Sequence, residues 1–239
     1  MPYPRFIRGF RRFRKRYMEG KAPLFRDLVK KGQAPETLVI ACSDSRNDPA
    51  LLTQSQPGDL FVVRNVAALV PPYQPDGQYH GTSAAIEFAV RSLGVKNIIV
   101  LGHGLCGGIQ TLADSSAGTA SGYEFLTPWV SICAEARDTV QRELADQPVE
   151  TRLQTLERAA ILTSLNNLLT FPWIREAVEA GHMTLHGWYF DMAKGTLLGY
   201  GPATRTFEPL GQNAKALAGI KGLDSCCIAS FVKGSAAAA

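Results

Sequence analysis

The sequence predicts an α/β fold: a central, mostly parallel β-sheet flanked by helices, with an N-terminal helical arm and a helical C-terminal half that ends in a hairpin. Short apolar runs typical of buried strands alternate with helical patterns over residues 37–101, which is the βαβ rhythm of a parallel sheet. Aromatic residues recur at helical spacing before residue 20, and long helical patterns follow residue 128. These three observations together indicate the α/β class.

The expected strands are short apolar runs bounded by polar or glycine-containing segments. They lie at 37–42, 59–64 and 96–101. A hairpin is expected over 183–200, because two strand-like runs flank a turn at Lys194 and Gly195. Residues 65–80 contain several prolines and form a long loop, and loops of this length are often functional.

The expected helices lie at 22–32, 81–94, 128–146 and 149–169, with another that starts near Pro172. Gly32 is a typical residue at a helix C-terminus, and Thr127 and Pro128 are typical of an N-cap and a first helical position. Residues 235–239, at the end of the chain, are expected to be disordered.

The length fits one large domain or at most two, and we expect a single domain over residues 1–239. Hydrophobic residues make up 46% of the chain and charged residues 19%, and no apolar stretch is long enough to span a membrane. The five cysteines are odd in number and widely scattered, and no signal-peptide pattern precedes them. We therefore expect a reducing compartment and a cytoplasmic protein.

The basic character of the chain belongs to its N-terminal arm. Seven arginines and lysines precede the first acidic residue, so the rest of the chain is net acidic although the whole carries +4. Phe6, Phe10, Phe13 and Tyr17 recur at steps of four, three and four, which places them on one side of a helix. Packing against the body or a partner subunit is the favoured interpretation. A transit segment and contact with nucleic acid or an anionic membrane are the alternatives.

A thiol, an acid and a base follow the strand expected at 37–42. They are Cys42, Asp44 and Arg46 in the run LVIACSDSR. If the extended geometry continues beyond the strand, these three side chains point to the same side. On its own, such a stretch could equally be a half-buried cysteine beside an exposed ion pair.

The strand expected at 96–101 ends in the same way, since IIVLGHGLCGG places His103 and Cys106 in a glycine-rich turn before a helix. Parallel strands deliver their C-terminal ends to one edge of a sheet, where ligand sites of open α/β folds lie. Two cysteines, a histidine and an aspartate are a tetrahedral zinc set. A phosphate-binding loop is excluded, because the motif lacks the Lys-Ser/Thr ending.

Asp44 is the displaceable member of this ligand set. Arg46 can pair with its carboxylate and so open the fourth coordination position to water. Zinc with one open position converts water into a hydroxide nucleophile near neutral pH. The pattern therefore favours a catalytic zinc site over a purely structural one.

These motifs closely resemble those of the beta-class carbonic anhydrases. The resemblance covers most of residues 5–200 through the ordered segments CSDSR, PGDLFVVRNVA, LVPPY, YHGTSAAIEFAV, VLGHGLCGGI, TFPWIREAVEAG and LHGWYFD. It implies that Cys42, His103 and Cys106 bind one zinc ion per chain. Asp44 would be the fourth ligand or, paired with Arg46, would orient the zinc-bound hydroxide. The implied reaction is the reversible hydration of carbon dioxide to bicarbonate and a proton, by attack of that hydroxide.

The resemblance also implies a substrate pocket and an oligomer. Gln33 would hydrogen-bond a substrate oxygen, Phe61, Val66 and Phe88 would form an apolar wall, and the Gly107 backbone would lie close to the substrate. The family builds this cleft at the interface of a homodimer or higher oligomer, with aromatic wall residues from the partner chain. The arm over residues 1–34 would then wrap around the neighbouring subunit, with no nucleic acid or membrane as partner.

Four positions depart from the family pattern. Val39 stands where the bicarbonate-regulated subgroup carries a tryptophan, which implies the accessible-site, non-allosteric subgroup. Phe88 replaces a tyrosine found in some members, Ala68 replaces a common asparagine, and Asn47 replaces the usual valine.

Two other functions remain open at this point. The same zinc site could hydrolyse carbon disulfide or carbonyl sulfide, since both are linear and apolar like carbon dioxide. Alternatively, the chain could be a zinc-stabilised binding protein whose basic arm holds RNA or anionic lipid. Asp44 and Arg46 speak against this last function, because a structural site needs no switchable ligand.

Overall fold

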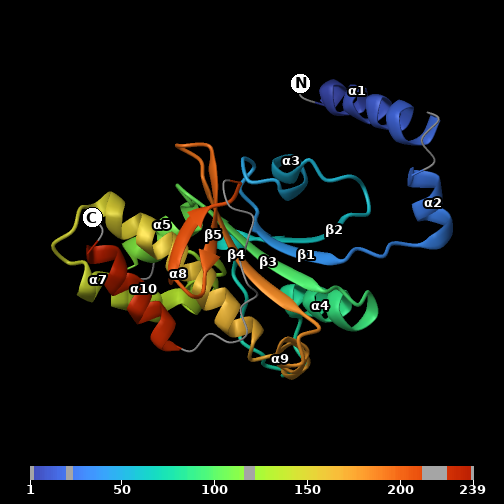
Figure 1. Cartoon of the computed structure of the whole chain (residues 1–239). Coiled ribbons are helices and arrows are strands. Elements are labelled where there is room, and N and C mark those ends of the chain that lie inside the picture. Colours follow the sequence, from blue (N-terminus) through green and yellow to red (C-terminus); the bar gives the residue numbers. More distant parts are fainter. Residues whose placement is uncertain (1–2, 20–23, 116–121, 212–224, 238–239) are drawn as a thin grey trace.

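The sheet has six strands in the order β2-β1-β3-β4-β5-β6 within the described part of the chain (Figure 1). The computed structural model describes residues 3–19, 24–115, 122–211 and 225–237. The parallel strands are β2 (Leu60–Asn65), β1 (Thr37–Cys42), β3 (Asn97–His103) and β4 (Thr184–Asp191). The antiparallel strands are β5 (Thr196–Gly201) and β6 (Thr206–Pro209). The mostly parallel sheet predicted from the sequence is confirmed.

The two central strands, β1 and β3, are covered on both faces, which explains their unbroken apolar sequences. Alternate residues of β1 point to opposite sides of the sheet: Leu38 and Ile40 join the larger core, whereas Val39 and Ala41 join a smaller cluster. Leu52 of the short helix α3 (Pro49–Thr53) packs against this smaller cluster.

Most helices contribute to the larger core. They are α4 (Gly81–Glu87), α5 (Gly107–Asp114), α6 (Leu126–Val130), α7 (Ala134–Glu143), α8 (Val149–Leu168), α9 (Pro172–Glu179) and α10 (Ser225–Ala237). Helix α8 packs closely on the centre of the sheet. An added Cβ at Gly102 of β3 would lie 2.7 Å from the side chain of Ile161, and one at Gly187 of β4 would lie 3.0 Å from it. Glycine at these strand positions therefore lets the helix and the sheet approach each other.

Two predicted helices are divided into shorter pieces. The helix expected at 81–94 is α4 followed by a π-helical turn, Phe88–Ser92. The stretch expected at 128–146 is α6, a 3₁₀ turn over Ser131–Cys133, and α7. The expectation of Thr127 as N-cap is wrong, because α6 begins at Leu126 with Phe125 as its N-cap. Pro128 still fits, since the first-turn amides have no partner within the helix.

The hairpin expected at 183–200 is confirmed as β4 and β5, and β6 extends it by a third antiparallel strand. Helix α10 was not predicted. It includes residues 235–237, which we expected to be disordered, whereas 238–239 lie outside the described residues. Phe231 of α10 is buried and packs 5.7 Å from the ring of Phe207 on β6, so apolar contact with the sheet fixes this helix.

The N-terminal arm extends away from the sheet (Figure 1). It consists of α1 (Tyr3–Arg14), a π-helical turn (Lys15–Glu19) and α2 (Leu24–Lys31), and none of these elements contains a buried residue. The predicted aromatic stripe is present: Phe13 lies 6.3 Å from Phe10, 5.0 Å from Tyr17 and 5.5 Å from Phe25, measured between ring centroids. Phe10 remains 63% exposed, so this stripe has no cover within the described chain.

No helix of the described residues has both the length and the apolarity needed to cross a membrane.

Candidate metal centre

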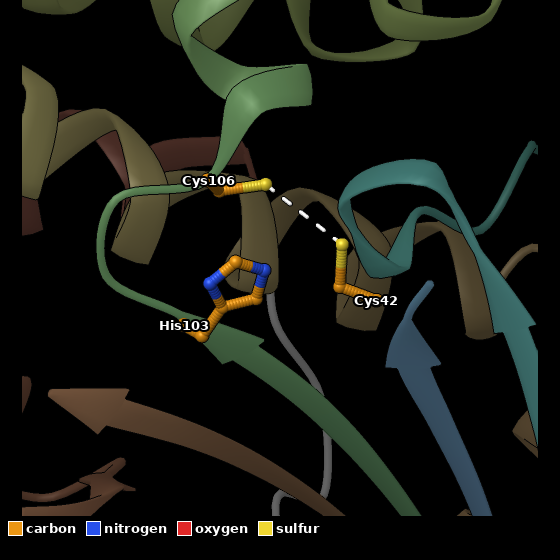
Figure 2. A group of neighbouring side chains, drawn as sticks. All are labelled: Cys42, His103 and Cys106. Atoms are coloured by element: carbon orange, nitrogen blue, oxygen red, sulfur yellow. Dashed lines mark hydrogen bonds between the residues drawn. The ribbon is translucent and has the colours of Figure 1, made fainter. Parts of the chain in front are cut away.

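The ends of β1 and β3 bring three metal-ligating side chains together. The two strands are hydrogen-bonded neighbours, so Cys42 and His103, the last residue of each, reach the same edge of the sheet. Cys106 follows as the N-cap residue of α5. Figure 2 shows the two sulfur atoms facing each other beside the His103 ring. The convergence predicted from the strand pattern is therefore present.

The geometry of this group fits a zinc ion. The Cys42 and Cys106 sulfurs lie 4.0 Å apart, and ligand atoms from all three buried residues lie within 4.8 Å of one another. Tetrahedral zinc with bonds to sulfur of about 2.3 Å would place two sulfurs about 3.8 Å apart. His103 Nδ1 bonds the Gly104 carbonyl oxygen at 2.8 Å, and its buried Nε2 has no hydrogen-bond partner among the described residues. A bound cation would satisfy that nitrogen.

The two cysteine thiols differ in how readily they ionise. The hydrogen bond between them, with further help from His103 and the Asp44 amide, lowers the pKa of Cys42 to about 4. The same hydrogen bond and burial raise the pKa of Cys106 well above its ordinary value. The Cys42 sulfur also lies 3.3 Å from the Ala67 amide, which stabilises a thiolate. Binding of a divalent cation between the two sulfurs would stabilise both of them as thiolates.

Asp44 and Arg46 form a bidentate ion pair beside this cluster. Arg46 Nε lies 3.0 Å from Asp44 Oδ1, and Arg46 Nη2 lies 2.7 Å from Asp44 Oδ2. The hydrogen bonds from Arg46 hold the pKa of Asp44 well below its usual range. The carboxylate thus points toward Arg46 and is not among the three residues that group as metal ligands.

The expectation that extended geometry continues through residues 42–46 is wrong. Strand β1 ends at Cys42, and the chain then turns. The Arg46 amide donates to Asp44 Oδ1 at 2.9 Å, and the Asn47 amide donates to the Asp44 carbonyl oxygen at 3.0 Å. Aspartate favours such a turn because its side chain can bond the backbone two residues on. The turn therefore brings the acid and the base together.

Arg64 of β2 is part of the site, although the sequence did not single it out. Its Nε donates to the Cys42 carbonyl oxygen at 3.0 Å, its Nη2 donates to the Asp44 carbonyl oxygen at 2.7 Å, and its Nη1 pairs with Asp48. One guanidinium thus bonds two backbone carbonyls at the start of the turn and one side chain beyond it. A charged residue within the strand DLFVVR was the only signal for it.

Glu157 of α8 and Tyr189 of β4 also contact the site and were not predicted. Glu157 accepts a hydrogen bond from the Cys106 amide at 3.1 Å and another from the Tyr189 hydroxyl at 2.7 Å. Burial raises the pKa of this carboxyl. An acidic residue at an otherwise buried helix position was the available signal, but its partners lie 51 and 32 residues away in the chain.

The residues expected to line the substrate pocket fall into two groups. Gly107 directly follows Cys106, and Val66 lies beside the same helix start, since an added Cβ at Gly108 would lie 2.5 Å from Val66 Cγ1. Phe61 lies elsewhere: it pairs in register with Leu38, at the amino end of β1. Phe88 packs against Phe61 with ring centroids 5.9 Å apart.

Gln33 is exposed on the segment that leads into the amino end of β1. Within a single chain, Val66 and Gly107 therefore lie near the metal ligands. Gln33, Phe61 and Phe88 lie at the opposite end of the strands.

Three of the four departures from the family pattern are buried, namely Val39, Ala68 and Asn47. Ala68 has φ of 56°, in the left-handed region that asparagine tolerates better than alanine does. Asn47 Nδ2 donates to the Leu101 carbonyl oxygen at 3.4 Å, whereas its Oδ1 has no partner among the described residues.

Fold and site together define a class: a zinc-binding α/β protein whose metal ligands follow two adjacent parallel strands. Comparison with known proteins identifies the family. The family profile described as carbonic anhydrase matches residues 37–197. Beta carbonic anhydrase 3 of Arabidopsis thaliana is 37% identical over 191 residues, which cover 79% of this chain and 72% of that protein. A carbonic anhydrase of Pseudomonas aeruginosa is 38% identical over 212 residues, covering 89% and 94%.

Solved structures agree with this assignment. The beta-carbonic anhydrase CcaA superposes with a TM-score of 0.79 at 34% identity, covering 88% of this chain and 92% of that one. A chain from the tetrameric beta-carbonic anhydrases of Sordaria macrospora superposes with a TM-score of 0.70 at 29% identity, covering 84% and 98%.

The chain belongs to the beta-class carbonic anhydrases. It is a zinc-dependent lyase that hydrates carbon dioxide. The two alternatives, a hydrolase for sulfur analogues and a non-catalytic binding protein, are not favoured by these relatives.

Proposed function

We propose that the Asp44–Arg46 pair controls the open metal position during carbon dioxide hydration. The observation that carries this proposal is the pairing of both Asp44 oxygens with one guanidinium, next to three ligands that leave a fourth position available. Zinc at this site would supply Lewis acidity, which makes water nucleophilic near neutral pH.

The residues of the chain would hold the ion in place and keep its open position free for water. Cys42, His103 and Cys106 would hold the ion, and the His103 ring is already oriented by its bond to Gly104. Arg46 would keep Asp44 away from the ion, so that its carboxylate can accept a hydrogen bond from water and orient it. Loss of this pairing would let Asp44 approach the open position and block it.

We further propose that the complete active site forms between two copies of the chain. Phe61 is four residues from the strand end that lies beside Cys42, a separation of about 13 Å along an extended chain. Gln33 and Phe88 lie at the same remote end as Phe61. If these three residues line a zinc site, it is the site of a neighbouring copy. An active site built from residues of two copies supports a homodimer or a higher homo-oligomer.

The arm gives independent support for an oligomer. Its exposed aromatic stripe needs an apolar cover, and the described body of the same chain supplies none. A second apolar surface lies beside the metal site, where Phe125 and Trp129 line a cavity of about 740 Å³ that also contacts Val66. We propose that the arm packs on a second copy. The relative from Sordaria macrospora named above is tetrameric.

Two further assignments follow from the residues. Val39 occupies the position of the regulatory tryptophan, so we propose activity without cooperative bicarbonate inhibition. We also propose a cytoplasmic location, because Cys42, Cys106 and Cys133 are free and buried. A steep, cooperative loss of activity on adding bicarbonate would contradict the first of these assignments.

The test of the proposed function combines metal analysis with kinetics on one sample. Purified protein is expected to contain about one zinc per chain and to hydrate carbon dioxide in a stopped-flow indicator assay. Removal of zinc with a chelator should abolish activity, and adding zinc back should restore it. Full activity in the metal-free protein would contradict the proposal.

A further inference from the structure

A buried carboxylate lies directly behind the metal-ligand loop. Glu157, in the middle of α8, is only 6% exposed, and both of its oxygens are used. Oε1 accepts from the Cys106 amide, and Oε2 accepts from the Tyr189 hydroxyl. A buried carboxylate is costly unless such bonds satisfy it, so this residue needs a reason to be there.

The loop that Glu157 contacts has an unfavourable backbone conformation. Leu105, between His103 and Cys106, has φ of 58°, in the left-handed region that favours glycine. Two side chains hold its peptide groups from opposite sides. Arg46 Nη2 donates to the Leu105 carbonyl oxygen at 3.3 Å, and Glu157 accepts from the amide of the next residue, Cys106. The carboxylate is also stabilised by the Leu105 amide.

Tyr189 fixes the direction of the Glu157 carboxylate. The Arg158 guanidinium lies over the Tyr189 ring, 4.7 Å from its centroid, and so restricts the tyrosine from one side. At the hydroxyl end of the ring, Gly104 approaches so closely that an added Cβ would lie 3.0 Å from the hydroxyl oxygen. Glu157 and Tyr189 therefore form a rigid support under Gly104, Leu105 and Cys106.

We propose that Glu157, oriented by Tyr189, is a positioning residue of the zinc centre. It holds the loop over residues 104–106 in the conformation that places the Cys106 sulfur for the metal and the Leu105 carbonyl oxygen for Arg46. The proposal rests on the zinc site described above and extends it to a carboxylate that touches neither metal nor substrate. Loss of this support would loosen Cys106 first, and the Arg46 contact through Leu105 would follow.

The experiment compares zinc release and cobalt spectra among three variants of the full-length protein. Glu157→Ala removes the support, and Glu157→Gln keeps an amide oxygen that can accept from Cys106. Glu150→Ala is the matched control, because Glu150 lies on the same helix and lines the same cavity of about 330 Å³ but is exposed. Zinc release is followed with a chromophoric chelator. Cobalt(II) reports ligand geometry through its thiolate charge-transfer and visible bands.

Glu157→Ala is expected to bind zinc about 10–100-fold more weakly and to show weakened thiolate bands, as for other residues that support metal ligands. Glu157→Gln should recover most of this affinity, and Glu150→Ala should match the wild type. A wild-type release rate and cobalt spectrum in Glu157→Ala would overturn the proposal, even if activity or stability fell.

A second variant covers the case in which Glu157→Ala does not fold. Tyr189→Phe keeps the buried ring and removes only the hydroxyl that orients the carboxylate. It should release zinc faster than the wild type, and a wild-type release rate in Tyr189→Phe would then overturn the proposal. Failure of the zinc site itself is a separate outcome, since the wild-type protein would then bind no zinc.

Discussion

Arg46 bonds both oxygens of the Asp44 carboxylate, through Nε at 3.0 Å and Nη2 at 2.7 Å, although only one residue separates the two in the chain. The turn after β1 makes this possible, because the Arg46 amide bonds the same carboxylate. The guanidinium is thus positioned by its own backbone as well as by its partner.

Arg46→Ala should keep about one zinc per chain but lose about 100-fold or more of the hydration rate. Without the guanidinium, Asp44 is free to approach the metal and close its open position. Arg46→Lys tests whether charge alone suffices, and it should also be impaired because an ammonium cannot form the fork. Zinc content and stopped-flow rates on the same samples distinguish closure of the metal position from loss of the metal. Arg46→Ala with most of its activity left would mean that the pair is not a switch.

His103→Ala and Cys106→Ala should each lose both zinc and activity, because the ligands that remain are too few to retain the ion. Cys133→Ala is the control, since Cys133 is a fully buried free thiol whose pKa is raised by burial to about 12 and which lies outside the ligand group. It should keep its zinc. Metal analysis after gel filtration checks all three, and a metal-free but active Cys106→Ala would refute the ligand assignment.

Asn47→Val should raise the free energy of unfolding by about 1 kcal/mol. Asn47 is fully buried, and its Oδ1 has no partner among the described residues, while its Nδ2 makes one long bond to Leu101. Valine removes the unsatisfied acceptor and fills a similar space. Urea unfolding of the zinc-loaded protein measures the change. A lower midpoint for Asn47→Val would show that the bond to Leu101 outweighs the unsatisfied oxygen.

Deletion of residues 1–17 should weaken the oligomer and reduce activity, because the aromatic stripe loses its contact with a neighbouring copy. Arg8→Gln is the control, since it removes a charge of the same helix but leaves the stripe intact. Sedimentation velocity over a range of concentrations gives the oligomeric state of each form. An unchanged oligomer after the deletion would show that the arm does not hold the subunits together.

The hydration rate, as kcat/KM, should rise through about pH 7 and level off only above about pH 8. Two thiolates neutralise the formal charge of zinc, so it acidifies water less than a site with three histidines does. Protonation of Asp44 does not cause this change. Its pKa is lowered by Arg46, so its favourable pairing is present above the ordinary pKa and is lost only at much lower pH. A flat profile between about pH 6 and 8 would contradict this prediction.

The metal ligands could be predicted because each lies at the end of a strand or within three residues of it. A run such as LVIAC specifies a buried strand. Because parallel strands end at the same edge of a sheet, the end of this strand places Cys42 near His103. This inference needs only the local sequence and the order of the strands. It does not depend on the exact helix boundaries, which is why the broken stretch at 126–143 did not disturb the prediction.

The support behind the ligands could not be predicted in this way. Glu157 belongs to a helix with mixed polar and apolar residues, and nothing local shows that its carboxylate meets the Cys106 amide. The turn at Asp44 and the helix α10 were missed for related reasons. A side-chain bond to the backbone decided the first, and packing against β6 decided the second.

The separation of the ligands along the chain also fixes the order in which a nascent protein can acquire its metal. Cys42 is synthesised 64 residues before Cys106, an interval of roughly 3–13 s at ordinary translation rates. Glu157 follows after another 51 residues. During this interval the nascent chain carries Cys42 without the other two ligands. Zinc binding by all three ligands therefore requires that Cys106 has been synthesised and that β3 has joined β1.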